Sequence, residues 1–370
     1  MAVSGPRRSG TVDGVESADL DISALHAYLQ GRAAAEEFSG VVRIDCGGRP
    51  IYDEAFGLAS RAWRAPCRRE TRFDCASVTK LFTAVAVLQQ IDAGAFALDT
   101  STTGYLELEG TAISPAVTPY HLLTHTSGIA DDADEEAGER YEDVFADRPN
   151  YSVRSTADFL PQFVYKPPNF APGAGCRYCN CSYVLLGLMV ERASGLSYRE
   201  YVKANVFEPA GMVRSGFFRM DQVEPDVAEG ADPVVAADGT VSAWRRNIYS
   251  FPPIGSPDGG AHTTTADLLS FHRALLDGRL LSHELTAAML TPKEDLRPTQ
   301  GGMHRTGFGF EFEVASDGEV VSYWKEGINP GVSAVLCHHG RSDATFAVLS
   351  NRESGAWGPV ETIERLLAAT

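Results

Sequence analysis

The sequence predicts a mixed α/β fold of the α+β type, in which both ends of the chain build one antiparallel sheet. Strand-like runs occur near the two ends, the middle has the pattern of helices and long loops, and a helical run lies near each end. The economical arrangement places the terminal helices on one face of the sheet and an all-helical lobe above it. We expect a sheet lobe over 18–75 and 255–370 and a helical lobe over 76–254.

The N-terminal part contributes a helix and a hairpin to the sheet lobe. Residues 22–35 have the pattern of a helix, with Asp21 as its N-cap. Residues 40–46 and 51–56 flank a turn at 47–50 that is rich in glycine and ends in proline. This pattern predicts a β-hairpin.

The remaining chain divides near residue 254. Residues 118–254 favour helices and long loops, and one of the loops, 131–143, is densely acidic. That loop is either a solvated surface excursion or a lid or partner site. Strand patterns then return between two helical runs. The expected elements are a helix at 264–276, strands at 308–314, 320–324, 331–338 and 345–350, and a helix at 360–369.

Charge and hydropathy disfavour several kinds of partner. The net charge of −17 disfavours nucleic acid and anionic membranes. No run approaches the roughly 18 consecutive apolar residues of a membrane helix. Residues 1–17 are polar and lack the apolar core of a signal peptide, so we expect a flexible leader on a cytoplasmic protein. The oligomeric state is left open.

The cysteines indicate neither a disulfide framework nor a metal. Seven cysteines is an odd number, and they are scattered along the chain, which fits a reducing compartment. Cys176, Cys179 and Cys181 lie close in sequence, but no nearby histidine or second Cys-x-x-Cys completes a zinc set. We expect them to be small packing residues, and we expect no cofactor.

The first candidate catalytic motif is Ser77-Val-Thr-Lys80. An apolar helix pattern follows at 82–93 and ends at Gly94. Residues three apart on a helix share a face, so the Lys80 amine can reach the Ser77 hydroxyl. The helix N-terminus also favours negative charge on that oxygen. Ser77 is therefore placed to be an acylated nucleophile.

The second motif is Tyr178-Cys179-Asn180, just before another helix pattern. Residues two apart in an extended segment project to the same side, so Tyr178 and Asn180 can both face Ser77. The phenol can accept the serine proton if nearby cations lower its pKa. The carboxamide can hold Lys80 or a substrate carbonyl.

The third motif is Lys325-Glu326-Gly327, at the end of the expected strand 320–324. A lysine beside a glycine at a strand end lets a carbonyl substrate lie along the strand edge. The backbone N–H of Ile328, directly after Gly327, can then pair with that of Ser77 to form an oxyanion hole.

The order and spacing of the three motifs resemble the serine β-lactamase and penicillin-binding protein superfamily, whose boxes include Ser-x-x-Lys and Lys-Thr-Gly. The middle box is Tyr-x-Asn rather than Ser-Asp-Asn, which is similar to the class C β-lactamase branch with its family VIII carboxylesterases, D-aminopeptidases and acyltransferases. The resemblance extends from about Ile22 to Ala369. Supporting stretches lie at 122–128, 172–173, 185–187, 209–212 and 265–268.

This resemblance implies a two-lobe fold with the active site between the lobes and an acyl-enzyme on Ser77. It implies that Tyr178, with Lys80, removes the serine proton and returns it to the leaving group. Ser77 and Ile328 would hold the oxyanion with their backbone N–H groups. Lys325 would keep the cluster cationic, and Asn180 would orient Lys80 and the acyl group.

One departure from the family pattern bears on the substrate. Glu326 stands where β-lactamases have threonine. If its carboxylate faces the cleft, it repels the carboxylate of a β-lactam. If it points away, it is only a strand residue. Both interpretations stay open at the level of sequence.

Five other residues have either a structural or a functional interpretation. His125 is either a structural residue of a turn that supports the helical lobe or a catalytic base, and we favour the turn. His262 is interpreted as a residue at a helix entry. Trp244 and Tyr249, with Phe251 after them, either line an apolar acyl pocket at the cleft mouth or pack in the core.

Three functions follow from these residues. The first is a serine hydrolase or acyltransferase that acts on a small ester, thioester or amide, with water or another acyl acceptor releasing the acyl group. The second is a class C-type β-lactamase or D-amino-acid peptidase. The third is a non-catalytic binding protein on the same scaffold.

Overall fold

The protein is built around an eight-stranded antiparallel sheet. The computed structural model describes residues 20–134 and 137–368. In order across the sheet the strands are β2 (Arg49–Phe56), β1 (Gly40–Cys46), β14 (Ala344–Ser350), β13 (Val332–His339), β12 (Val320–Asn329), β11 (Glu311–Ala315), β10 (Gly302–Thr306) and β9 (Glu294–Pro298).

The two ends of the chain meet inside this sheet. Strand β1 pairs with β14 along its whole length, from Gly40 opposite Ser350 to Cys46 opposite Ala344. The N-terminal hairpin therefore extends the C-terminal strands. The predicted fold class, one antiparallel sheet from both chain ends with helices around it, is confirmed.

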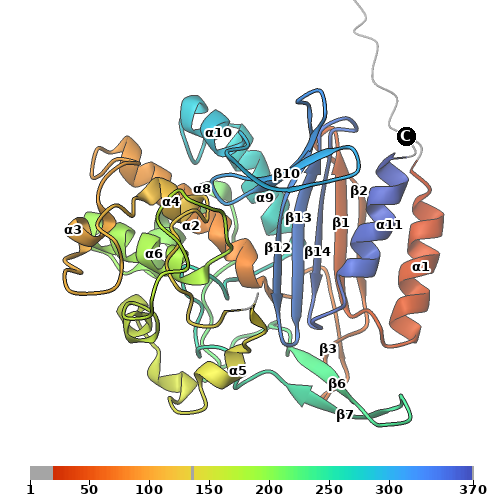
Figure 1. The fold of residues 1–370 in the computed structure, drawn as a ribbon. Helices are drawn as coiled ribbons and strands as arrows, with labels where there is room; N and C mark the ends of the chain where they lie inside the picture. The colour runs from red at the N-terminus through yellow and green to blue at the C-terminus, as the bar shows by residue number, and fades with distance from the viewer. Residues whose placement is uncertain (1–19, 135–136, 369–370) are drawn as a thin grey trace, which may run out of the picture.

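Two terminal helices cover one face of the sheet, α1 (Ile22–Ala34) and α11 (Trp357–Ala368) (Figure 1). Helix α1 begins where expected, because the Asp21 carboxylate accepts a hydrogen bond from the Ala24 N–H at 2.9 Å. Leu29 of α1 and Ile363 of α11 are fully buried in the core against this face.

The other face packs against the helical part of the chain (Figure 1). Its central helix is α2 (Thr79–Asp92), in which every residue from Thr79 to Leu88 is buried. A helix that is apolar on all sides is a core helix, and α2 links the site to the main core. The other helices are α3 (Thr102–Leu106), α4 (Pro119–Leu123), α5 (Tyr141–Val144), α6 (Asn180–Ser194), α7 (Tyr198–Val202), α8 (Glu208–Ala210), α9 (Thr265–Leu276) and α10 (His283–Met289).

The structure differs from the sequence predictions at several strands. The strand expected at 308–314 begins at Glu311, and β12 continues five residues past its predicted end, to Asn329. Strands β9 and β10 were not predicted, because the polar run of β9 lacks an apolar alternation. The structure also has three two-stranded sheets: β3 (Leu58–Ser60) with β4 (Ala65–Pro66), β5 (Phe73–Asp74) with β8 (His262–Thr263), and β6 (Ala231–Val235) with β7 (Val241–Arg246).

Two further expectations concern the chain's organisation. The predicted leader, 1–17, lies outside the described residues. The predicted lobe boundaries at 75/76 and 254/255 stay a prediction. Among the described helices, none has the length and apolar character needed to cross a bilayer.

Candidate active site

Ser77 lies in a single 3₁₀ turn, Ala76–Val78, that leads directly into α2. Ala76 has a φ of +42°, a conformation that costs free energy for a residue with a Cβ. Its N–H donates to the Asp74 side chain at 2.7 Å, and Asp74 is held in β5 opposite His262 of β8. The short β5–β8 pair thus fixes the turn that presents Ser77 at the helix start.

The Lys80 ammonium group has a complete set of acceptors. Its Nζ donates to Ser77 Oγ at 3.0 Å, to Asn180 Oδ1 at 2.6 Å and to the Asp258 backbone oxygen at 2.6 Å. Lys80 is fully buried. An ammonium has three donors, so these contacts satisfy it and fix its direction toward the serine.

Tyr178 contacts the same serine oxygen from the other side. Its hydroxyl donates to Ser77 Oγ at 2.7 Å. The Nζ atoms of Lys80 and Lys325 lie 5.0 Å and 4.9 Å from the centre of the Tyr178 ring. The structure therefore brings Ser77, Lys80, Tyr178, Asn180 and Lys325 together.

Lys325 is held by an acidic residue that the sequence analysis missed. Its Nζ lies 2.8 Å from Glu311 Oε1, and Glu311 Oε2 lies 3.0 Å from His304 Nε2. Burial acts to raise the pKa of Glu311, but Lys325 and His304 outweigh it and hold that pKa well below its usual range. No motif pointed to Glu311, because it reaches Lys325 through the pairing of β11 with β12.

Gly327 allows β12 to approach the nucleophile. A Cβ at this position would lie 2.3 Å from the Cys75 backbone oxygen and 2.8 Å from the Ser77 nitrogen. Only a residue without a side chain fits there. The next residue, Ile328, lines the same cavity as Ser77.

Glu326 lies on the opposite side of β12 from these groups. Lys325 and Gly327 are buried, whereas Glu326 between them is exposed, as strand alternation requires. Its charge acts on Glu364 of α11, whose pKa is raised by burial, by Glu361 and by Glu326. The pKa of Glu326 is itself raised by burial and by Glu311, against the opposing effect of Lys325. Glu326 does not line the cavity beside Ser77, which matches the strand-residue interpretation.

Neither Trp244 nor Tyr249 lines the cavity beside Ser77. The Trp244 ring packs between two guanidinium groups, with the Cζ of Arg61 and Arg352 at 3.3 Å and 5.2 Å from its centre. The Tyr249 side chain is 73% exposed. The interpretation of these two residues as walls of the cavity beside Ser77 is therefore not supported. Phe251 does line the cavity.

The cavity beside Ser77 has a volume of about 400 Å³ and a mixed lining. Besides Phe251 and Ile328, it contains the carboxyl groups of Asp132 and Asp258. Burial, with the charges of Asp131 and Asp258, raises the pKa of Asp132 well above its usual range. Burial also raises the pKa of Asp258, against the opposing effect of Lys80.

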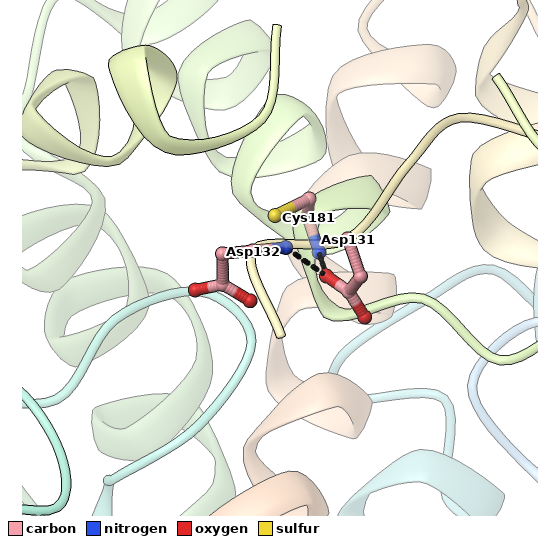
Figure 2. Close-up of side chains that lie close together, drawn as sticks. All are labelled: Asp131, Asp132 and Cys181. Atoms are coloured by element: carbon pink, nitrogen blue, oxygen red, sulfur yellow. Dashed lines mark hydrogen bonds between the residues drawn. The ribbon is translucent and has the colours of Figure 1, made fainter. Parts of the chain in front are cut away.

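The start of the acidic loop, 131–134, faces inward rather than forming a surface excursion. Asp132 is only 8% exposed, and Asp131 Oδ1 accepts from the N–H groups of Asp132 and Cys181 at 3.1 Å and 2.9 Å (Figure 2). Possible ligand atoms of these three residues lie within 4.8 Å of one another. They do not fit a metal ion, because backbone donors occupy Asp131 and burial raises the pKa of the Cys181 thiol well above its usual value.

His125 supports the Tyr178 loop. It adopts a φ of +59°, and its Nδ1 accepts from the Cys179 N–H at 3.1 Å. Its ring lies 4.6 Å from that of Tyr178. Burial, reinforced by Lys325 and Lys80, lowers the pKa of His125 well below its usual value. His125 thus carries a neutral ring that packs behind the tyrosine, while Ser77 Oγ receives its contacts from Lys80 and Tyr178.

Comparison with known proteins places this arrangement in a family. The model of the beta-lactamase family matches residues 25–370. A penicillin-binding protein of Bacillus subtilis is 27% identical over 89% of this chain and 71% of its own length. Esterase EstB of Burkholderia gladioli is 37% identical over 65% of this chain and 67% of its own length.

A solved structure extends the similarity to the whole fold. The penicillin-binding protein from Bacillus halodurans superposes with a TM-score of 0.83 at 37% identity, over 92% of this chain and 99% of that one. The family match spans the three motifs around Ser77, Tyr178 and Lys325. The chain therefore belongs to the beta-lactamase family and is a serine hydrolase of the acyl-enzyme type.

Proposed function

We propose that Ser77 attacks the carbonyl carbon of a small ester, thioester or amide and keeps the acyl group as an ester. The observation that carries this is the double contact at Ser77 Oγ, which both Lys80 and Tyr178 approach within 3.0 Å. As the Oγ–carbon bond forms, the serine proton passes to the Tyr178 oxygen of the pair Tyr178–Lys80, with Tyr178 ionised before the attack and Lys80 kept as an ammonium. The same pair then protonates the leaving group when its bond to the carbonyl carbon breaks.

The remaining groups stabilise charge in this scheme. The negative oxygen of the tetrahedral intermediate accepts from the backbone N–H groups of Ser77 and Ile328, which Gly327 allows to lie close together. The ammonium of Lys325, fixed by Glu311, lies beside the Tyr178 ring and stabilises negative charge on its oxygen. Water or another acyl acceptor then attacks the acyl-enzyme and releases Ser77.

The cavity favours neutral or cationic acyl substrates. Five acidic residues line the cavity, Asp74, Asp132, Glu224, Glu229 and Asp258, against two arginines, Arg219 and Arg246. An anionic ligand is repelled by those carboxyl groups that are ionised, whereas burial shifts Asp132 and Asp258 toward their neutral forms. A neutral ester brings no such cost, which supports esterase or acyltransferase activity.

Acylation by a β-lactam or a D-peptide is the second candidate. It is favoured by the similarity over nearly the whole chain to penicillin-binding proteins. A non-catalytic binding role, the third candidate, is disfavoured by the assembled contacts of Ser77, Lys80 and Tyr178. A cytoplasmic location fits the seven free thiols and is tested by cell fractionation.

The test compares kcat/KM for p-nitrophenyl acetate and nitrocefin in the wild type and in Ser77→Ala. We expect the ester to be preferred, and Ser77→Ala to lose at least about 10³-fold in ester turnover at an unchanged unfolding midpoint. Intact mass after incubation with each substrate identifies the acyl group on the protein. Near wild-type turnover in Ser77→Ala rejects the acyl-enzyme, and a wild-type preference for nitrocefin favours the second candidate.

Two further variants separate the possible sources of charge selection. Asp132→Asn removes a cavity carboxyl whose pKa is raised, so it is expected to raise kcat/KM for nitrocefin relative to the ester at alkaline pH, where the wild-type carboxyl group is ionised. Glu326→Thr is the matched control on the other face of β12 and is expected to leave that ratio unchanged. If Glu326→Thr raised this ratio and Asp132→Asn did not, Glu326 would be the residue that disfavours anionic substrates.

A further inference from the structure

Asp131 makes an unusual number of contacts for a loop carboxylate. Its Oδ1 accepts from the N–H groups of Asp132 and Cys181, as Figure 2 shows. Its Oδ2 accepts from Asn180 twice, from the backbone N–H at 2.8 Å and from the side-chain Nδ2 at 3.4 Å. The carboxylate therefore sits at the first turn of α6 and holds both the backbone and the side chain of Asn180.

The direction of the Asn180 amide matters for Lys80. The amide offers one oxygen and one NH₂ group, which are an acceptor and a donor. Its Oδ1 accepts from the Lys80 ammonium at 2.6 Å. If the amide turned over, its NH₂ group would face an ammonium that can only donate. Asp131, which can only accept when ionised, favours the orientation in which Nδ2 points to it and Oδ1 points to Lys80.

The Asp131 segment is itself fixed in place. The ammonium of Lys166 donates to the backbone oxygens of Asp131 and Asp132 at 2.9 Å and 2.8 Å. The Tyr141 hydroxyl also accepts from Asn180 Nδ2. The loop thus presents a rigid acceptor to Asn180.

We propose that Asp131 is a positioning residue of the active site, which fixes the Asn180 amide so that Asn180 Oδ1 holds the Lys80 ammonium against Ser77. The inference rests on the proposed function for its kinetic consequences. Asp131 does not line the cavity beside Ser77, so its removal is expected to act on the catalytic step rather than on substrate binding. A displacement of about 1 Å in a catalytic group costs about 10²-fold in rate.

The first experiment compares Asp131→Ala with Asp21→Ala in turnover of p-nitrophenyl acetate. Asp21 is the matched control, because it is an aspartate at the start of α1, on the far side of the sheet. Either variant removes an acceptor of the first N–H groups of a helix, so a loss of stability is common to both. We expect only Asp131→Ala to lower kcat, by about 10- to 100-fold, with KM within about threefold. Unchanged kcat in Asp131→Ala would reduce Asp131 to a helix cap and overturn the inference.

A double-mutant cycle identifies the path of the effect. If Asp131 acts through Asn180, then Asp131→Ala has little further effect in an Asn180→Ala background, and the double variant matches Asn180→Ala within about twofold. Multiplicative losses would overturn the proposal. Should Asp131→Ala fail to fold, Asp131→Asn replaces it in the same cycle, because it keeps one oxygen acceptor for the helix N–H groups.

A crystal structure of the Asp131 variant separates this inference from the proposed function. If the wild type shows no Ser77-dependent turnover, the proposed function has failed and kinetics cannot judge Asp131. The contact between Asn180 Oδ1 and Lys80 Nζ then decides. Its loss or a turned amide supports the positioning role, and its retention at the present 2.6 Å overturns it.

Discussion

At the scale of single residues, the site works through buried polar groups that satisfy one another. Lys80 is fully buried, and Lys325 is only 2% exposed. Each is held by acceptors from other segments, Lys80 by Asn180 and the Asp258 backbone, and Lys325 by Glu311. A buried ammonium group without an acceptor would cost free energy. Each lysine side chain is therefore held in the one position that keeps its acceptors. The two ammonium groups are therefore already in place beside Ser77 and Tyr178 before a substrate binds.

The roles of Tyr178 and His125 can be separated by substitution. Tyr178→Phe removes the hydroxyl that contacts Ser77 Oγ, and we expect kcat to fall by about 10²- to 10⁴-fold with little change in unfolding midpoint. His125→Ala removes a buried ring that packs on Tyr178, and we expect it to act mainly on stability. Stopped-flow acylation and thermal unfolding of both variants are the measurements. A fully inactive His125→Ala with a wild-type unfolding midpoint would point to a serine–histidine mechanism instead.

At the scale of elements, the site is the meeting point of a helix start, a loop and a strand. The strained turn before α2 presents Ser77, the segment before α6 presents Tyr178 and Asn180, and β12 brings Lys325. The close approach of β12 to the turn depends on Gly327.

Gly327→Ala tests this close approach. The added Cβ would lie 2.3 Å from the Cys75 backbone oxygen, and a backbone atom cannot rotate away. We expect kcat/KM for p-nitrophenyl acetate to fall by at least about 10²-fold, because β12 and its oxyanion donor must move away from Ser77. Gly301→Ala, at a position with no atom within 4 Å of the added Cβ, is the control and should behave as wild type. Full activity in Gly327→Ala would show that the strand can shift without consequence.

At the scale of the whole molecule, the buried His272 and the half-buried His338 join α9 to the sheet. His272 of α9 is 4% exposed, its Nε2 lies 2.7 Å from the Tyr323 hydroxyl of β12, and its ring stacks on His338 of β13. Burial, with His338 and Arg273, lowers the pKa of His272 to about 3. The interface between helix and sheet is therefore built for a neutral imidazole.

This interface makes the free energy of unfolding depend on pH in a definite direction. The unfolded chain takes up a proton at His272 near pH 6.5, whereas the folded protein does so only near 3. Stability is therefore unaffected above about pH 6.5 and falls by about 1.4 kcal/mol per pH unit below it for this one group. Urea unfolding at pH 7, 6 and 5 measures the slope, and His272→Gln should reduce it by about that amount. An unchanged slope would show that His272 protonates without opening the interface.

The sequence by itself determined the nature of the chemistry and the class of fold. Helix geometry explains why Ser77 and Lys80, three residues apart, can meet. The strand patterns at both ends of the chain predicted a shared sheet. Patterns among neighbouring residues were sufficient for both predictions. The helix after Asp21 and the hairpin at its predicted place are features of neighbouring residues and were predictable for the same reason.

Tertiary structure alone decided which groups surround these motifs. Glu311 reaches Lys325 only through strand pairing, and Asp131 reaches Asn180 only because a loop 49 positions earlier in the chain folds over the start of α6. The face of β12 that carries Glu326 depends on where the strand begins, and a shift of one residue would reverse it. Trp244, which the sequence left open between a pocket wall and core packing, lies against two arginines from distant segments and does not line the cavity. Contacts between residues far apart in sequence leave no local pattern. The residues that hold the catalytic side chains, Glu311 and Asp131, could therefore be found only from the fold.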